Sequence, residues 1–597
     1  MIKLHSFHIP VMGIGFTVDS PLKVAPLGID SVISLVDDVL LERLRKVYCD
    51  KFQIPYEEIS DKIDDFRAKR ITSYLNLIND LVDKKLNEFK KISHDKIDDV
   101  KAYFDLLPDQ SAVKQEFKKI TDKYFNVQEV SEWLKGLSKG SIDVNIMTKI
   151  DKDNYRANEQ LPIEYNDAHA AVRGYANSNL ASSLVLSAGM NPRLYAYMEK
   201  FQDFYPNEKG ELKKKIVLKV SDHRSALIQG KFLAKKGLWV SEFRIESGLN
   251  CGGHAFATDG FLMGPILEEF STKREDLIKE MHDIYKNTLS KRGLFVPSGP
   301  LPIKLTAQGG VGTAEEHNFL IDHYNVDSVG WGSPFLLVPE AVSIDDNTLS
   351  LLSEADEEKL YLSDISPLGV KFNSLKGNTK DIEKENKIKE GKPGSSCPRR
   401  GLAFNREFTE KPICTASSRY QRLKIKELEK ENLPKEKYQE KYNKIVEKSC
   451  ICVGLGVSTL LINNLDTSIE GDGVSVCPGP NLAYFSKIVS LKDMVGHIYG
   501  RTNLITKSNR PHMFIKELNI YLDYLKEKVE DSKKSFDETQ EKYLKKFTSN
   551  LEDGFEYYHQ LFSNTKGSFE EIKSKILNDL DLSYQKLKNI HLEIEKL

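Results

Sequence analysis

Eight short apolar runs constrain the fold of this chain more than any other feature of its sequence. They are rich in β-branched residues and lack the polar alternation of a half-exposed strand, which is typical of strands covered on both faces. Several precede helix-like segments, such as residues 223–237 after the fifth run. Repeated strand–helix alternation predicts an α/β fold, a (β/α)₈ TIM barrel with its active site on the loops after the strands. The runs are residues 8–15, 31–36, 142–147, 182–189, 215–221, 238–247, 302–310 and 326–333.

Three segments do not follow this alternation. Residues 39–140 carry helical periodicity and many charges, which predicts a large helical insertion after strand 2, either a lid or partner surface or a solvated decoration. Residues 375–395 are charged and contain Gly and Pro, which predicts a mobile connection. Beyond it we expect a cysteine-containing extension and a helical tail that packs on the body or on another chain. The predicted units are a barrel of residues 1–38 and 141–374, the insertion 39–140, the extension 375–510 and the tail 511–597.

Composition limits the class of protein. At 597 residues the chain is too long for one core. A net charge of −2 gives no reason to expect nucleic acid as a partner, and no apolar run approaches the roughly 20 residues of a membrane span. The N-terminal apolar stretch contains His8 and Pro10, which favours a first strand over a signal peptide. Seven cysteines, an odd count, argue against an oxidising compartment, so we expect a cytoplasmic protein.

Glycines follow the seventh and eighth runs. The block GGVGT (309–313) precedes a helix-like segment, where backbone N–H groups suit a phosphate at a helix N-terminus. Gly332 and Ser333 would complete the cradle, because barrels often bind phosphate after strands seven and eight. A tight turn is the alternative for the first block taken alone. The predicted phosphate-binding residues are Gly309, Gly310, Gly312, Gly332 and Ser333.

A third glycine block ends the sixth run. Residues 247–254 read SGLNCGGH, and Gly252 and Gly253 allow a flat ligand to approach the backbone closely. His254 is the group in this block that titrates near neutral pH. Together the three blocks predict a flavin mononucleotide (FMN) site at the C-terminal mouth of the barrel.

The order of these blocks resembles the FMN-dependent nitronate monooxygenase and enoyl-acyl-carrier reductase family. The matching motifs are GGH (252–254), GGV (309–311) and WGSPFLLVPEA (331–341). Residues 360–379 are similar to a segment of the trans-acting enoyl reductases of polyunsaturated fatty-acid synthases. The acidic residue that often precedes GGH in the reductases is Asn250 here.

The resemblance also implies roles for individual residues. The opening HIPVMGIG resembles the family's first strand, VNIM (144–147) its third-strand motif, and LKVS (218–221) its fifth-strand lysine motif. The resemblance implies that His254 moves a substrate proton. The alternative is that His254 only hydrogen-bonds the flavin or a core carbonyl. The further residues implied to lie near the flavin are Gly13, Ile14, Gly15, Asn145 and Lys219.

Five of the seven cysteines fall within residues 397–477. Two of them precede proline in a glycine-rich turn, as in loops that bind iron–sulfur clusters. The sequence leaves three interpretations open: a cluster, a zinc site, or ordinary buried thiols. Nearby arginines are candidates for binding a phosphate of NADPH or of a phosphopantetheine arm, or else they form a solvated or salt-bridged surface. The candidate metal ligands are Cys397, Cys414, Cys450, Cys452 and Cys477, and the arginines are Arg399, Arg400, Arg406, Arg419 and Arg422.

The favoured function is an FMN-dependent oxidoreductase that transfers hydride from reduced flavin to an activated double bond, with NAD(P)H a candidate electron donor. The substrate would be a small molecule or an acyl-carrier-bound chain. Three alternatives stay open: nitronate monooxygenase-type oxidation, a flavin-binding docking subunit of a lipid or polyketide synthase, and a flavin/iron–sulfur electron-transfer protein. The helical regions 39–140 and 511–597 are the candidate surfaces for such a synthase partner or for a homo-oligomer.

Overall fold

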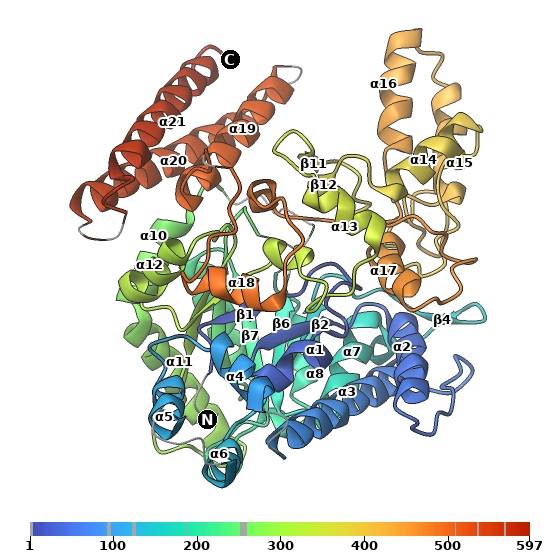
Figure 1. Cartoon of the computed structure of the whole chain (residues 1–597). Coiled ribbons are helices and arrows are strands. Elements are labelled where there is room, and N and C mark those ends of the chain that lie inside the picture. Colours follow the sequence, from blue (N-terminus) through green and yellow to red (C-terminus); the bar gives the residue numbers. More distant parts are fainter. Residues whose placement is uncertain are drawn as a thin grey trace.

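Eight parallel strands close into a barrel, which confirms the predicted (β/α)₈ fold (Figure 1). The computed structural model describes residues 4–91, 97–121, 127–187, 189–250, 253, 259–507, 509–533, 536–565, 567 and 569–597. Each barrel strand overlaps one predicted run, and β1 closes the ring by pairing with both β10 and β2. Around the ring the strands are β1 (Phe7–Ile9), β10 (Ser328–Gly330), β9 (Lys304–Gln308), β8 (Val240–Glu246), β7 (Lys214–Val220), β6 (Ser182–Ser187), β3 (Ile142–Met147) and β2 (Asp30–Ser34).

Both faces of the barrel strands are buried. Val32, Val185 and Val217 form a separate apolar cluster, while the adjacent Ile33 and Leu184 belong to the main core. This double burial explains why the runs are apolar throughout. The helices that follow the strands are α1 (Ser20–Val24), α7 (Asp167–Ala176), α8 (Pro192–Met198), α9 (His223–Ala234), α10 (Met263–Thr272), α11 (Arg274–Lys291), α12 (Ala314–Tyr324) and α13 (Asp346–Ser353).

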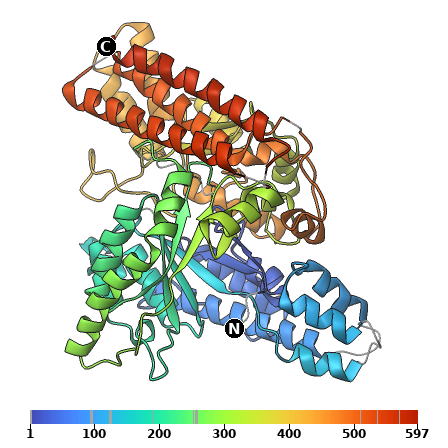
Figure 2. The same ribbon diagram turned by 90° about the vertical axis from the view of Figure 1, so that its left-hand side faces the viewer.

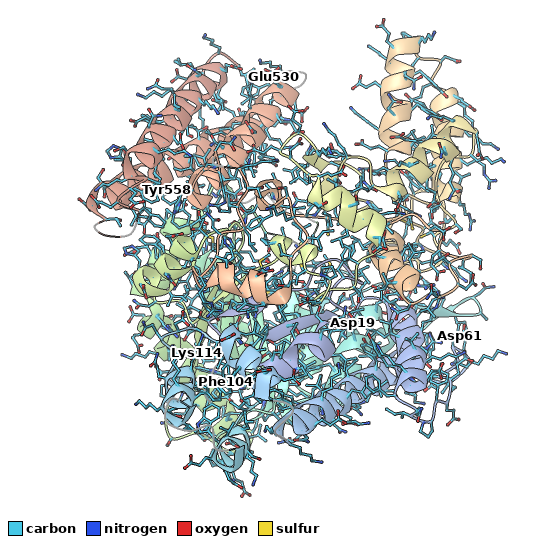
Figure 3. The ribbon with its side chains drawn as sticks, in the orientation of Figure 1. Asp19, Asp61, Phe104, Lys114, Glu530 and Tyr558 are labelled. Atoms are coloured by element: carbon cyan, nitrogen blue, oxygen red, sulfur yellow. The ribbon has the colours of Figure 1, made fainter. Side chains whose placement is uncertain are left out.

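The insertion after β2 consists of two parts. Helices α2 (Asp38–Lys51) and α3 (Phe66–Lys90) contribute to the main core and cover the barrel. Helices α4 (Ile97–Leu106), α5 (Ala112–Thr121) and α6 (Val127–Leu134) lie to one side in Figure 2 and share a small core of their own. In that core Phe104, labelled in Figure 3, stacks on Phe117 with ring centroids 3.6 Å apart. Only this second part is therefore a decoration, and residues 39–90 supply helices of the barrel.

The extension beyond the barrel lies over its mouth. Residues 375–395, expected to be a mobile connection, contain helix α14 (Thr379–Lys389) instead. The side chain of Asn378 caps this helix by accepting from the amide of Asp381, and Glu383 pairs with Lys380 and Lys387 on successive turns. This cap and these ion pairs stabilise the helix although few of its residues are apolar. The other elements are the hairpins β4 (Tyr155–Arg156) with β5 (Glu159–Gln160) and β11 (Leu360–Ser363) with β12 (Phe372–Leu375), and helices α15 (Ser418–Glu429), α16 (Lys435–Val446), α17 (Ile451–Ile462) and α18 (Leu491–Ile498).

The predicted helical tail is present as three helices that pack on the body beside α10. They are α19 (Met513–Ser532), α20 (Glu538–Asn564) and α21 (Lys573–Ile594). Tyr558 of α20, labelled in Figure 3, accepts a hydrogen bond from the amide of Gly264 at 3.1 Å. Glu517 of α19 accepts one from the amide of Met263 at 2.9 Å. Within the described residues, no single helix has the length and apolar character of a membrane span, whereas α16 and α17, bent by 48° relative to each other, pass that test as a pair.

Candidate functional site

A cavity opens at the C-terminal mouth of the barrel. Its wall is built from the ends of successive strands and the loops that follow them, so the barrel places residues far apart in sequence around one space. The predicted residues Gly13, Ile14, Asn145 and Lys219 all line it. The remaining lining residues are Val11, Ser34, Val36, Met147, Ile150, Ser187, Glu246, Asn250, Phe372, Gly401, Leu402, Ile451, Cys452 and Leu455.

A second, smaller cavity lies between the loops after β8, β9 and β10. It is lined by four of the predicted phosphate-binding residues, which the chain brings together from two separate loops: Gly309, Gly310, Gly332 and Ser333. Asn250 lines both cavities, so the two adjoin. The remaining lining residues are Leu249, Gln308, Val311, Gly330, Pro334 and Asn481.

A polar network joins the two cavities. Lys219 forms an ion pair with Glu246, with 2.5 Å between Nζ and Oε1. The Nε2 group of Gln308 donates to Oε1 of Glu246 at 3.0 Å and to Oδ1 of Asn250 at 2.7 Å, and Asn250 donates to Glu246. The network fixes one cation and one carboxylate at the wall of the larger cavity.

Two buried side-chain oxygens at these cavities have no hydrogen-bond partner in the described part of the chain. They are Oδ1 of Asn145, in a side chain of the larger cavity, and Oε1 of Gln308, in a side chain of the smaller one. Asn145 is 4% exposed and Gln308 is 2% exposed, so bulk water does not satisfy them. A buried acceptor without a donor costs free energy, roughly 1–3 kcal/mol. Each is therefore suited to a ligand that brings a donor group.

Backbone amides of the smaller cavity are also unpaired. The N–H groups of Gly310, Val311, Gly332 and Ser333 make no hydrogen bond to any other described residue. Gly310 has φ of +83°, a left-handed conformation that favours glycine. The Ser333 hydroxyl accepts a hydrogen bond from the amide of Gly479 at 2.8 Å, which closes this wall. Unpaired amides on two facing loops are typical of an anion site.

Gly15 and Gly312, also predicted to bind the cofactor, lie outside both cavity linings. The amide of Gly15 donates to the carbonyl of Leu455 at 2.8 Å, which holds the β1 loop against α17. The amide of Gly312 donates to Glu316 at 2.9 Å. Burial alone would raise the pKa of Glu316, but the charge of Arg510 and hydrogen bonds from Arg510 and Gly312 outweigh it and hold the pKa below its usual range. Gly312 therefore supports a buried ion pair.

The GGH block is described only at Gly253; Gly252 and His254 lie outside the described residues. The carbonyl of Gly253 accepts a hydrogen bond from the amide of Asn373 at 2.8 Å. A Cβ at Gly253 would lie 2.5 Å from the ring of Phe372, which lines the larger cavity. The block is thus next to the predicted site, and the role of His254 stays a prediction.

The five predicted cysteine ligands are all buried. Cys452 lines the larger cavity. Cys477 precedes Gly479 by two residues and lies on the segment that closes the smaller cavity. Of the neighbouring arginines, Arg399 pairs with Asp37 and Glu470. Its charge is therefore already compensated within the chain.

Several lining residues have no counterpart among the predicted ones. Glu246 and Gln308 end their strands directly before a glycine block, a position that points to the mouth and could have identified them. Phe372 begins β12, and Leu402 and Leu455 belong to the extension; nothing in their local sequence indicates that they form a wall of the cavity.

Comparison with protein-family models finds no match, and comparison with curated proteins finds none either. Among solved structures, the chain is similar to the enoyl reductase domain of MlnA from the macrolactin biosynthesis cluster of Bacillus amyloliquefaciens, at 12% identity and a TM-score of 0.33. It is also similar to FabK from Thermotoga maritima, at 14% identity and a TM-score of 0.29. A third similar structure is nitroalkane oxidase from Streptomyces ansochromogenes, at 7% identity and a TM-score of 0.31. The match to the MlnA domain covers 69% of this chain and 88% of that one. The match to FabK covers 66% and 83%, and the match to nitroalkane oxidase covers 83% and 96%, of this chain and of the matched chain respectively. At these TM-scores the similarities settle nothing about the reaction, and the chain is assigned to the (β/α)₈ barrels by its own closed ring of strands.

Proposed function

We propose that this protein is an FMN-dependent oxidoreductase that reduces an activated carbon–carbon double bond. The observation that carries the proposal is the pair of adjoining cavities, one large and mostly apolar, the other small and lined by unpaired amides. A flavin mononucleotide has these two parts, a flat ring and a phosphate, joined by a polar chain.

The smaller cavity fits the phosphate. Its unpaired amides, on the loops after β9 and β10, supply hydrogen bonds to an anion without a counter-cation. The unpaired Oε1 of Gln308 at the same place suits a hydroxyl of the linking chain, which brings a donor.

The larger cavity fits the ring. Asn145 brings an unpaired buried acceptor to it, and the ring of a flavin carries an N–H donor. Phe372, Leu402 and Leu455 line the cavity and present apolar surface to a flat ring. Gly13 and Ile14 bring backbone of the β1 loop to the same wall.

When bound, FMN supplies hydride from N5 of its reduced ring. Lys219 would stabilise negative charge on that ring, because its ammonium group is held in the cavity wall by Glu246. Glu246 in turn is positioned by hydrogen bonds from Gln308 and Asn250. These residues bind and tune the cofactor, and the proton for the product is assigned to His254.

Anaerobic spectroscopy of the full-length protein tests the proposal. Purified protein is expected to be yellow, to lose its flavin absorbance with NADPH or NADH, and to regain it when a 2-enoyl thioester is added. His254→Ala is expected to keep the colour and to lose reoxidation by the thioester. Oxygen-dependent turnover of a nitroalkane with no response to the thioester would favour the oxygenase reaction instead. Bound flavin that responds to neither class of substrate would favour a docking role.

A further inference from the structure

The loop after β9 is held by side chains of the extension. The carbonyls of residues 310, 311 and 312 accept hydrogen bonds from Arg510 at 2.9 Å, Asn481 at 2.7 Å and His497 at 2.8 Å, in that order. All three side chains are buried. Three successive carbonyls of the predicted phosphate loop are therefore fixed by groups that lie far along the chain.

The contact with Arg510 sets the direction of one amide in this loop. The carbonyl of Gly310 and the N–H group of Val311 belong to one peptide unit, which is planar and trans, so they point in opposite directions. Because the carbonyl points to the guanidinium of Arg510, the N–H group points away from it. Both residues line the smaller cavity, and this N–H group is one of its unpaired amides. Arg510 therefore orients an amide that the proposed phosphate would use.

The guanidinium of Arg510 joins several parts of this site. Its Nε donates to Oδ1 of Asn481 at 3.0 Å. Its Nη1 and Nη2 donate to the two carboxylate oxygens of Glu316, each at 2.7 Å, and Nη2 also donates to the carbonyl of Gly310. A lysine ammonium would keep the charge but lacks the planar fork that makes these contacts together.

Arg510 also compensates a buried charge next to the loop. Glu316, in the first turn of α12, is 2% exposed, and its carboxylate accepts hydrogen bonds from the amides of Gly312 at 2.9 Å and Met513 at 2.8 Å. Without a counter-charge this carboxylate would repel a phosphate bound at the neighbouring amides, because charges interact strongly where water is excluded. The ion pair with Arg510 opposes that repulsion.

The extension also contacts the second glycine loop. The amide of Gly479 donates to the hydroxyl of Ser333 at 2.8 Å, two residues before Asn481. A Cβ at Gly479 would lie 2.8 Å from this hydroxyl and 2.8 Å from the carbonyl oxygen of Leu249, so the segment packs closely against the loops after β8 and β10. Asn481 itself lines the smaller cavity. Residues 479–481 therefore connect the two loops that supply the unpaired amides.

The cysteines predicted as metal ligands do not form a comparable site. Across the described ranges, which include all five of them, no group of three or more His, Cys, Asp or Glu side chains is placed to hold a metal ion. The polar contacts that the extension makes with the phosphate loops come from guanidinium, carboxamide and imidazole groups instead.

We propose that Arg510 and Asn481 are positioning residues for the phosphate of FMN, which hold the loops after β9 and β10 so that their amides converge on one anion. The proposal deepens the flavin function and rests on it. Glycines alone leave the direction of their amides free, because they adopt many backbone conformations. The extension supplies the contacts that fix this direction.

Lysine in place of Arg510 tests the fork at constant charge. Flavin-depleted, full-length Arg510→Lys is titrated with FMN and with riboflavin, followed by quenching of flavin fluorescence. FMN affinity should fall roughly tenfold or more, as for loss of one hydrogen bond to a charged group, whereas riboflavin, which lacks the phosphate, should bind as it does to the unmodified protein. Arg45→Lys is the matched control, because Arg45 is also buried and donates to both carboxylate oxygens of Glu42, at 2.9 and 2.7 Å, but lies in α2, whose described residues line neither cavity.

Asn481→Ala tests the second contact and leaves the ion pair of Arg510 with Glu316 in place. The same phosphate-specific loss of affinity is expected, and this variant decides the question if circular dichroism shows that Arg510→Lys does not fold. Binding of inorganic phosphate to flavin-depleted protein, followed by broadening of its phosphorus NMR resonance, gives a readout that does not depend on flavin. Both variants should weaken this binding.

The two readouts separate failure of this inference from failure of the flavin function. An unchanged ratio of FMN to riboflavin affinity in both variants would overturn the inference and leave the flavin function standing. Equal losses of FMN and riboflavin would also overturn it, because they indicate a merely structural role. If the unmodified protein binds inorganic phosphate but neither flavin, the flavin function fails, and weaker phosphate binding by the variants would support the inference while unchanged binding would overturn it. An unmodified protein that binds neither phosphate nor flavin overturns both.

Discussion

Gly310→Ala perturbs the proposed phosphate site through one methyl group. Gly310 lies in the smaller cavity with φ of +83°. A Cβ added there would lie 2.4 Å from Cδ1 and 3.1 Å from Cβ of Leu249, which lines the same cavity. The loop or Leu249 must shift, and either shift changes the cradle. Gly377→Ala is a matched control, because Gly377 has the same φ of +83° and its added Cβ would meet only Leu351, at 3.9 Å.

The expected effect on affinity follows from this difference. A left-handed alanine costs each variant about 1–2 kcal/mol of stability. Only Gly310→Ala also loses a hydrogen bond from a cradle amide to the phosphate, and a hydrogen bond to a charged group contributes about 1.5–3 kcal/mol. FMN affinity should therefore fall roughly 10- to 150-fold relative to the control.

Titration of flavin-depleted protein with FMN and with riboflavin, followed by quenching of flavin fluorescence, measures this effect. Riboflavin lacks the phosphate, so its affinity should be similar in the two variants. The reasoning is refuted if Gly310→Ala binds FMN as tightly as Gly377→Ala does, or if it loses FMN and riboflavin to the same extent.

Three further variants test other parts of the site and its support. Asn145→Leu removes the unpaired acceptor of the larger cavity, and we expect FMN and riboflavin affinity to fall together by about fivefold in the same titration. Lys219→Met should retain flavin but slow anaerobic bleaching by NAD(P)H by about a hundredfold in stopped flow. Lys215→Met, at the exposed N-terminal end of β7, should leave the bleaching rate unchanged. Burial raises the pKa of Glu517 from 4.5 to about 7. The folded state is therefore stabilised when Glu517 is protonated, fully below pH 4.5, and it loses this stability as pH rises through 7. The free energy of unfolding should fall by up to about 3 kcal/mol over this range. Glu517→Gln should flatten this dependence in denaturant unfolding between pH 5 and pH 8; an unchanged slope would contradict the assignment.

The barrel could be predicted from the sequence because its signal is local. A strand covered on both faces must be apolar along its length, and all eight runs that meet this condition became strands of the ring. The meeting of the glycine loops could be predicted for the same reason, since Gly309 and Gly310 directly follow β9, while Gly332 and Ser333 follow β10 after one intervening residue.

The rest of the site depends on packing between distant segments. Gly312 carries the same local pattern as Gly310, yet its amide is taken by Glu316, whose partner Arg510 comes from the extension. Leu402 and Leu455 form cavity wall only because the extension folds back over the mouth.

The most direct test of the central claim is the flavin content of the full-length protein. Heat-released cofactor, separated by chromatography and quantified by absorbance, should be FMN at about one molecule per chain. A colourless preparation that also fails to quench the fluorescence of added FMN would contradict the account.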